Sequence, residues 1–242
     1  MFFNFLINKL RFVFSKYLEL KKSIRRSKTP IDVYLLKGYP LERDFGSKRG
    51  QPLDRYYIDL FINQKKDLIK GRVLEIGDDR YSKRFISAPQ RNVLRGRKNR
   101  GYKNYNGDLL NFATLKDIGQ FDTLIITNVL NFIFDYDEAI KNIAKLTSKG
   151  GKCLFTVSAF SGISKFDNDR WGDYWKFSQK SLGQILKKYF SNIEIDSFGN
   201  ASVSASFVLG LVTEDIPNTT LEIKDKNYPI IITALVSDPK KI

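Results

Sequence analysis

Short apolar runs alternate with amphipathic stretches over most of the 242 residues, and this alternation restricts the chain to one class of fold. RVLEIG at 72–77, FDTLIIT at 121–127 and KCLFTVS at 152–158 each predict a buried strand. Residues 135–147, between the last two, have helical periodicity. Strands that alternate with helices in this way form a mainly parallel sheet with helices on both faces. Such a sheet binds ligands at the carboxyl ends of its strands.

The ends of the predicted helices carry capping signals. Asp54 is expected to cap a helix that runs to about Ile69, and Ser178 a helix that runs to about Tyr189. The glycines at 150–151 are expected to close the helix before them. Three further segments complete the α/β pattern: strands at 192–198 and 229–236, and a small-residue helix or strand at 201–212.

The net charge of +15 comes from two segments. Residues 1–28 carry eight basic residues and one acidic residue, and residues 80–107 carry nine basic residues and no acidic one. The remainder of the chain sums to −1. Because a nucleic-acid binder needs an extended basic surface, this distribution places nucleic acid third among the partners considered.

Residues 1–28 predict a basic amphipathic helix, with phenylalanine and leucine on one side and lysine and arginine on the other. Such a helix suits an anionic membrane surface, which residues 1–26 would contact. Alternatively, its apolar face packs on the domain or on a second subunit. Residues 29–53 hold proline and glycine without periodicity and predict a linker or entry segment, so the folded domain is expected over 54–242.

The chain has no histidine and a single cysteine, Cys153. The first fact excludes serine–histidine and cysteine–histidine catalysis and removes the commonest zinc and iron ligand, so no metal site is expected. The second excludes an internal disulfide and favours a reducing, cytoplasmic setting. Chemistry in this chain must use carboxylates, lysine, tyrosine or a cofactor.

Four segments in order resemble the motifs of class I S-adenosylmethionine-dependent methyltransferases: GRVLEIGDD at 71–79, GDLL at 107–110, FDTLIITNVL at 121–130 and KGGKCLFTV at 149–157. The resemblance implies a Rossmann-like fold with a mainly parallel seven-stranded sheet, and S-adenosylmethionine as the cofactor.

A narrower resemblance is to methyltransferase-like proteins of bacterial surface-polysaccharide (O-antigen or capsule) gene clusters. It is carried by RGQPLDRYYIDLFI at 49–62, LEIGDDRYSKRF at 74–85, WGDYWKFS at 171–178 and FGNASVSASFVLGLV at 198–212.

The class I resemblance assigns cofactor contacts. A glycine after the first strand, here Gly77, lets the backbone approach the cofactor. Glu75 holds the cofactor's amino group or orders the loop around it, Asp108 accepts from the adenine amino group, and Asn128 opens onto the methyl-transfer cleft. Taken singly, each residue can equally be part of a turn. Three more residues complete the expected set: Tyr57, Asp78 and Leu109.

One departure counts against a working cofactor site. The family generally has an acidic residue at the end of the second strand for the ribose hydroxyls, and this chain has none between Asp79 and Asp108. It has the basic segment 91–103 instead. This segment has three interpretations: a solvated loop, a phosphate-binding loop for a nucleotide, lipid or sugar, or the sign of a site that no longer binds the cofactor.

The segment at 165–177 contains both tryptophans and three aspartates. Aromatic rings beside carboxylates suit a sugar, so Trp171 and Trp175 are candidate substrate contacts. Methylation of a hydroxyl needs a base; Asp173 is the first choice, with Asp169 and Tyr174 as further candidates beside Asp167. Alternatively, both tryptophans pack in the core beside the helix that follows.

The resemblances imply an S-adenosylmethionine-dependent enzyme that O-methylates a sugar, lipid-linked or nucleotide-linked, and we expect it to act at the inner face of the cytoplasmic membrane. The alternative is a non-catalytic methyltransferase-like module that binds a partner or membrane.

Overall fold

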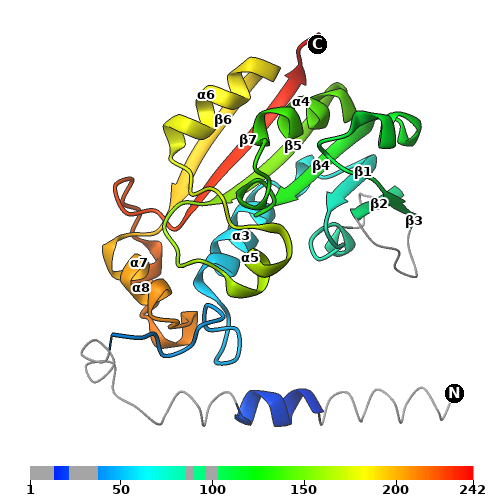
Figure 1. Ribbon diagram of the computed structural model, residues 1–242. Helices are drawn as coiled ribbons and strands as arrows, with labels where there is room; N and C mark the ends of the chain where they lie inside the picture. Colours follow the sequence, from blue (N-terminus) through cyan, green and yellow to red (C-terminus); the bar gives the residue numbers. More distant parts are fainter. Residues whose placement is uncertain (1–13, 22–37, 86–89, 96–102, 242) are drawn as a thin grey trace, which may run out of the picture.

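The computed structural model describes residues 14–21, 38–85, 90–95 and 103–241, which build a seven-stranded sheet with helices on both faces (Figure 1). The strand order is β3-β2-β1-β4-β5-β7-β6. The first five strands in this order are parallel, whereas β7 runs antiparallel to both β5 and β6. The predicted mainly parallel α/β fold is confirmed. The strands are β1 (Arg72–Ile76), β2 (Gln90–Arg95), β3 (Lys103–Asn106), β4 (Phe121–Thr127), β5 (Thr147–Ser158), β6 (Phe190–Phe198) and β7 (Ile231–Pro239).

α-Helices connect β4 to β5, β5 to β6 and β6 to β7, and short 3-10 turns lie in several loops. The α-helices are α3 (Leu53–Gln64), α4 (Tyr136–Leu146), α5 (Lys165–Trp171), α6 (Gln179–Tyr189), α7 (Ala201–Val208) and α8 (Asn218–Glu222). The 3-10 turns are η1 (Lys66–Leu68), η2 (Ser82–Arg84), η3 (Phe112–Thr114), η4 (Lys116–Ile118), η5 (Leu130–Phe132) and η6 (Thr213–Asp215).

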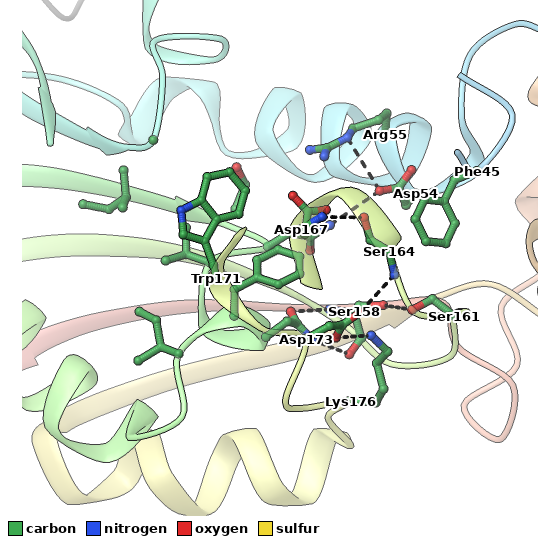
Figure 2. Close-up of a pocket in the computed structure, with 18 of the residues that line it drawn as sticks. Phe45, Asp54, Arg55, Ser158, Ser161, Ser164, Asp167, Trp171, Asp173 and Lys176 are labelled. Atoms are coloured by element: carbon green, nitrogen blue, oxygen red, sulfur yellow. Dashed lines mark hydrogen bonds and ion pairs between the residues drawn. The ribbon is translucent and has the colours of Figure 1, made fainter. Parts of the chain in front are cut away.

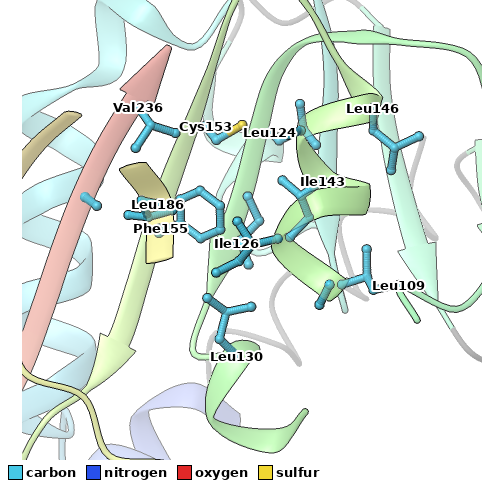
Figure 3. Packing of buried hydrophobic residues seen from close by; sticks show 14 of the residues in the cluster. Leu109, Leu124, Ile126, Leu130, Ile143, Leu146, Cys153, Phe155, Leu186 and Val236 are labelled. Atoms are coloured by element: carbon cyan, nitrogen blue, oxygen red, sulfur yellow. The ribbon is translucent and has the colours of Figure 1, made fainter. Parts of the chain in front are cut away.

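Each face of the sheet carries its own hydrophobic core, because successive side chains of a strand point to opposite faces. Leu124 and Ile126 of β4 pack with α4 and α6, as Figure 3 shows, whereas Ile125 between them packs with α3 and α7. A strand buried on both sides needs a continuous apolar run, which is the pattern that FDTLIIT displays. The two cores leave only the strand ends free for a site.

The predicted cap at Ser178 is confirmed, the predicted cap at Asp54 is wrong, and Asp135 caps α4 without having been predicted. Asp135 accepts from the Glu138 N–H at the start of α4, and Ser178 accepts from the Ser181 N–H at the start of α6. Helix α3 begins one residue before Asp54, with Pro52 in the capping position and no side-chain cap. Proline suits this place because it has no N–H to leave unpaired. Asp54 is thereby free to turn toward the strand ends.

The boundaries of three predicted elements differ from the structure. Helix α4 ends at Leu146 and passes directly into β5, so the glycines at 150–151 lie within that strand rather than closing the helix. The Thr147 hydroxyl donates to the Ile143 carbonyl at 2.8 Å and makes the stop without glycine. The helix predicted to reach Ile69 ends at Gln64 and continues as η1, and the segment 201–212 is helical only to Val208.

The N-terminal part of the chain contributes two described pieces. Residues 14–21 are helical with every side chain exposed, and the rest of the helix predicted over 1–28 lies outside the described residues. Part of the predicted entry segment packs on the domain: the Leu41 N–H donates to the Leu209 carbonyl, and Phe45 stacks on Phe207 at 5.2 Å between ring centres. Within the described ranges, no helix has the length and apolar character needed to cross a membrane.

Candidate functional site

A cavity of about 410 Å³ opens at the carboxyl ends of β1, β4 and β5 (Figure 2), where an α/β sheet is expected to bind its ligand. One side, the strand-end wall, consists of residues 76–81 and 127–133. The opposite side, the α5 wall, consists of residues 158–176. Helix α3 supplies Asp54 and Arg55. The residues that line the cavity are Phe45, Asp54, Arg55, Ile76, Gly77, Asp78, Arg80, Tyr81, Thr127, Asn128, Val129, Asn131, Phe132, Ile133, Ser158, Ser161, Gly162, Ser164, Asp167, Trp171, Asp173, Lys176 and Phe207.

Gly77 forms the first part of the strand-end wall. Its φ of +98° is a backbone conformation that residues with a side chain rarely adopt, and its N–H donates to the Leu94 carbonyl at 2.9 Å. A Cβ at this position would meet no atom within 4 Å, because it would project into open space. The absence of a side chain at Gly77 therefore leaves the room through which a ligand can approach the backbone.

Glu75 lies beneath this wall and is almost completely buried. Its carboxylate accepts from the Tyr81 N–H at 3.1 Å and from the Ser82 N–H at 2.7 Å. Burial raises the pKa of Glu75 to about 7, against the lowering effect of these hydrogen bonds. Glu75 is not among the residues that line the cavity. The resemblance implies that Glu75 either holds the cofactor's amino group or orders the loop around the cofactor. The hydrogen bonds from the Tyr81 and Ser82 N–H groups correspond to the second role.

Asn128, Asp54 and Arg55 form a polar group where β4 meets α3. Asn128 has a φ of +51°, and its side-chain nitrogen lies 3.5 Å from the Asp54 carboxylate. The Nε of Arg55 lies 3.6 Å from the same carboxylate. Burial disfavours the charge of Arg55, yet Asp54 and the Tyr81 hydroxyl together hold its pKa above the ordinary value. A cation and an anion thus face the cavity side by side.

The sequence reasoning assigned neither Asp54 nor Arg55 to the site. The sequence feature that could have indicated them is a charged pair in the first turn of an otherwise apolar helix, just before the first strand. The same feature is equally typical of a helix cap.

On the α5 wall, Asp173 lines the cavity but is heavily engaged. Its side chain is 2% exposed, pairs with the Lys176 ammonium at 2.5 Å and accepts from the Ser164 N–H at 3.2 Å. Asp167, one turn into α5, also lines the cavity, and its carboxylate has no partner within the described residues. These acids are not gathered as metal ligands would be, since no such group of three occurs in the described parts of the chain.

Asn131 joins the two walls and was missed by the sequence reasoning. Its buried side-chain amide donates to the carbonyls of Ser158 and Trp175 and accepts from the Ser158 N–H. Its backbone carbonyl accepts from the Tyr174 N–H. A single asparagine after a strand carries no sequence signal for this role.

Other predicted substrate-side residues lie at the cavity or beside it. Trp171 lines the cavity and is 57% exposed. Trp175 instead packs on Tyr136, and its indole N–H donates to the Phe134 carbonyl at 3.0 Å, which corresponds to the packing alternative. Two further candidates are not among the lining residues: Asp169, which pairs with Lys165 on the surface, and Tyr174, which packs against Phe134.

The predicted cofactor residues divide in the same way. Gly77, Asp78 and Asn128 line the cavity, whereas Tyr57, Asp108 and Leu109 do not. Tyr57 is buried and donates to the Leu221 carbonyl, Leu109 belongs to the core, and Asp108 is exposed with its carboxylate accepting from the Leu110 N–H. Asp108 follows β3, next to residues 96–102, which lie outside the described parts.

The basic segment 91–103 begins as a strand, not as a loop. Residues 91–95 belong to β2, and the Arg91 guanidinium donates to the Lys83 carbonyl at 3.1 Å. The solvated-loop interpretation is therefore wrong for this first part, while residues 96–102 lie outside the described structure.

Comparison with known proteins identifies the fold. No family model and no curated protein sequence matches the chain. A SAM-dependent methyltransferase from Archaeoglobus fulgidus superposes with a TM-score of 0.52 at 12% identity, covering 77% of this chain and 94% of that one. The [4+2]-cyclase SpnF superposes with a TM-score of 0.50 at 14% identity, covering 78% of this chain and 82% of that one. The N-methyltransferase NodS from Bradyrhizobium japonicum WM9, in complex with S-adenosyl-L-homocysteine, has a TM-score of 0.49 at 15% identity. The match covers 92% of this chain and 100% of that one.

At these identities the likeness concerns the fold alone, and SpnF bears the name of a cyclase. Nothing in these matches bears on the polysaccharide-cluster subgroup. The strand order, the antiparallel β7 and the superposition agree: this chain has the Rossmann-like fold of class I S-adenosylmethionine-dependent methyltransferases.

Proposed function

We propose that this protein is an S-adenosylmethionine-dependent methyltransferase. The observation that carries the proposal is the open space beside Gly77, on the wall of a cavity at the carboxyl ends of three strands. A side chain at this position would fill the space, and the backbone conformation itself selects glycine.

The chemistry of the cavity wall fits the amino-acid end of this cofactor, which carries both an ammonium and a carboxylate. The Arg55 guanidinium can pair with the carboxylate and the Asp54 carboxylate with the ammonium, and the Asn128 side chain lies within reach of Asp54. The resemblance adds Asp108 for the adenine amino group. When bound, the cofactor supplies an activated methyl group for transfer to a nucleophile.

We further propose that the acceptor is a sugar hydroxyl on the α5 wall. Trp171 exposes a ring for stacking, and the serines at 158, 161 and 164 offer hydroxyl groups to a polar substrate. The contacts favour Asp167 over Asp173 as the base that takes the hydroxyl proton, since Asp173 is held by Lys176 and by the Ser164 N–H. Asp173 then has a positioning role.

The role in surface-polysaccharide synthesis rests on the resemblance of the sequence blocks alone. A lipid-linked or nucleotide-linked sugar at the cytoplasmic side of the membrane is the corresponding acceptor, and residues 1–26 would attach the protein to anionic lipid. Deletion of residues 1–26 is then expected to reduce salt-dependent binding to anionic vesicles.

A non-catalytic module is the second candidate. The absence of an acidic residue between Asp79 and Asp108 favours it, since the ribose hydroxyls of the cofactor lack their usual carboxylate.

Calorimetric titration with S-adenosylmethionine and S-adenosyl-L-homocysteine decides between these candidates. The matched variants are Gly77→Ala and Gly150→Ala, because both glycines have positive φ and a Cβ at either meets nothing within 4 Å, but only Gly77 lines the cavity. Both changes carry a similar backbone strain of about 1 kcal/mol. We expect micromolar binding in the wild type and in Gly150→Ala, and an affinity lower by about tenfold or more in Gly77→Ala. No heat with either ligand in the wild type would overturn the enzyme proposal and favour the module.

A further inference from the structure

Large apolar side chains are exposed around the mouth of the cavity. Most of the exposed large apolar side chains in the described ranges lie in two places: the helix at 14–21 and the segment after β5 together with its neighbour Phe134. We define the second set as the apolar rim. It consists of Phe134, Phe160, Ile163, Phe166, Trp171 and Tyr174.

The rim and the cavity alternate along the same stretch of chain. Phe160 precedes the cavity-lining Ser161, Ile163 lies between Gly162 and Ser164, and Phe166 precedes Asp167. Ser161, Ser164 and Asp167 line the cavity, whereas Phe160, Ile163 and Phe166 do not line it and are exposed, Ile163 at 69%. A soluble monomer rarely exposes so many apolar side chains around one opening, so the rim marks a contact surface.

Ring contacts link the rim residues in two pairs. Phe134 contacts Tyr174 at 5.5 Å between ring centres, and Phe166 contacts Trp171 at 6.2 Å. Tryptophan and tyrosine beside aliphatic and phenylalanine side chains are the composition that protein segments adopt at a lipid–water interface.

The aspartates that lie between the rim residues after β5 are paired or line the cavity, so they do not repel an anionic surface. Asp169 is paired with Lys165 at 2.6 Å, Asp173 is buried and paired with Lys176, and Asp167 lines the cavity. The Arg170 guanidinium lies over the Phe166 ring at 3.5 Å and leaves a cation at the edge of the aromatic surface. The second exposed apolar segment, residues 14–21, belongs to the stretch 1–28 with its eight basic residues and one acid.

From these observations we propose that the apolar rim docks on the surface of an anionic lipid bilayer, so that the cavity opens toward the lipid. Side chains at 160, 163 and 166 enter the interfacial region, and Arg170 stays at the level of the phosphates. The acceptor is then an amphiphile whose polar end enters the cavity from the bilayer surface. This last point rests on the methyltransferase function proposed above, whereas the docking does not.

Vesicle co-sedimentation of the full chain tests the docking. The rim variant Phe160→Ser/Ile163→Ser/Phe166→Ser is compared with the control Val208→Ser/Ile223→Ser/Tyr228→Ser, which removes three exposed apolar side chains from α7 and the segment after it. On vesicles of equal parts phosphatidylcholine and phosphatidylglycerol, the rim variant is expected to bind at least about tenfold more weakly than the wild type, and the control as the wild type. Equal binding of all three proteins, or no binding by the wild type, would overturn the proposal.

Fluorescence locates the contact independently. The chain has two tryptophans, of which Trp171 is in the rim and Trp175 packs against Tyr136. With brominated lipid in the same vesicles, Trp175→Phe, which keeps Trp171, is expected to lose emission, and Trp171→Phe is not. The reverse pattern would contradict rim insertion. S-adenosyl-L-homocysteine titration separates the two proposals. Retained affinity for this ligand together with lost vesicle binding in the rim variant supports both, whereas vesicle binding by the wild type without any affinity for the ligand supports the docking alone.

Discussion

The two walls of the cavity are built by different means. The strand-end wall is held by the backbone: the Gly77 N–H donates to Leu94 of the neighbouring strand, and the Asn128 N–H donates to Thr156. The α5 wall is attached through the side chain and the backbone carbonyl of Asn131, and within the wall Asp173 pairs with Lys176. The strand-end wall is therefore part of the sheet, whereas the α5 wall is a short helix tied onto it.

This difference corresponds to the two tasks that the proposed transferase function requires. A cofactor site must keep its shape, and backbone hydrogen bonds within a buried sheet provide the most rigid support. An acceptor site can vary by substitution in a covering loop without disturbing the sheet. The four predictions below test whether the walls behave as separate units.

The largest expected effect concerns the proposed base. Asp167→Asn should lower the rate of labelled methyl transfer to a panel of nucleotide sugars and glycolipids by at least about 100-fold, as loss of a general base does. Its affinity for S-adenosyl-L-homocysteine should not change, because that ligand belongs to the strand-end wall. Asp169→Asn, a surface change on the same helix, is the control. An unchanged rate in Asp167→Asn would exclude Asp167 as the base.

The second effect concerns Glu75 beneath the strand-end wall. Its pKa rises from 4.5 to about 7 on folding. Below pH 4.5 both the folded and the unfolded chain carry the proton, and above pH 7 both have lost it, so the burial cost of the charge develops between these values. The free energy of unfolding should therefore fall as pH rises through this window, by at most about 3 kcal/mol.

Urea unfolding at pH 5 and pH 8 measures this effect, with Glu75→Gln expected to abolish most of the difference. Burial acts to raise the pKa values of Asp137 and Asp196, but hydrogen bonds from Lys188 and Lys224 lower them overall. These two carboxylates make the free energy of unfolding rise with pH, and they do so only below pH 3.8. An identical pH slope in Glu75→Gln would show that another group is responsible.

The third effect compares two ion pairs of the α5 segment. Asp173→Asn should reduce the free energy of unfolding by about 2 kcal/mol. The change removes the carboxylate that pairs with the Lys176 ammonium, at a position where the side chain is only 2% exposed. Asp169→Asn removes an exposed pair and should cost no more than about 0.5 kcal/mol. Chemical denaturation measures both. Equal costs would mean that Asp173 does not secure the α5 wall.

The smallest effect concerns two helix caps. Ser164 accepts from the Asp167 N–H at the start of α5, and Ser178 caps α6 in the same way. Each change to alanine costs about 1 kcal/mol. In Ser164→Ala, amide hydrogen exchange should become faster only within α5. In Ser178→Ala it should become faster across the sheet, because α6 packs in the core and α5 does not. Global loss from Ser164→Ala would show that the two walls form one unit.

The order of strands and helices and the cap at Ser178 could be predicted from the sequence, because these features depend on neighbours along the chain. A continuous apolar run such as FDTLIIT must be buried on both faces, and a serine or aspartate before a helical pattern satisfies the first N–H groups. The motif resemblance also named Gly77 and Asn128 as site residues, and both line the cavity because both directly follow strands.

The other site residues depended on contacts between distant segments. Trp171 and Trp175 are four residues apart and equivalent in the sequence, but one lines the cavity and the other packs against Tyr136. Asp54 has the sequence context of a helix cap and instead lies beside Asn128, 74 residues away. Lys176 and the Ser164 N–H both contact the Asp173 carboxylate, whereas neither contacts that of Asp167.

The sequence alone determined the α/β fold and predicted the carboxyl edge of the sheet as the place of the site, because both follow from local periodicity, and the motif resemblance added Gly77. The tertiary structure alone decided which carboxylates are free, which aromatic side chains are exposed and which charges share the cavity, because burial and pairing arise only when segments distant in the chain come together.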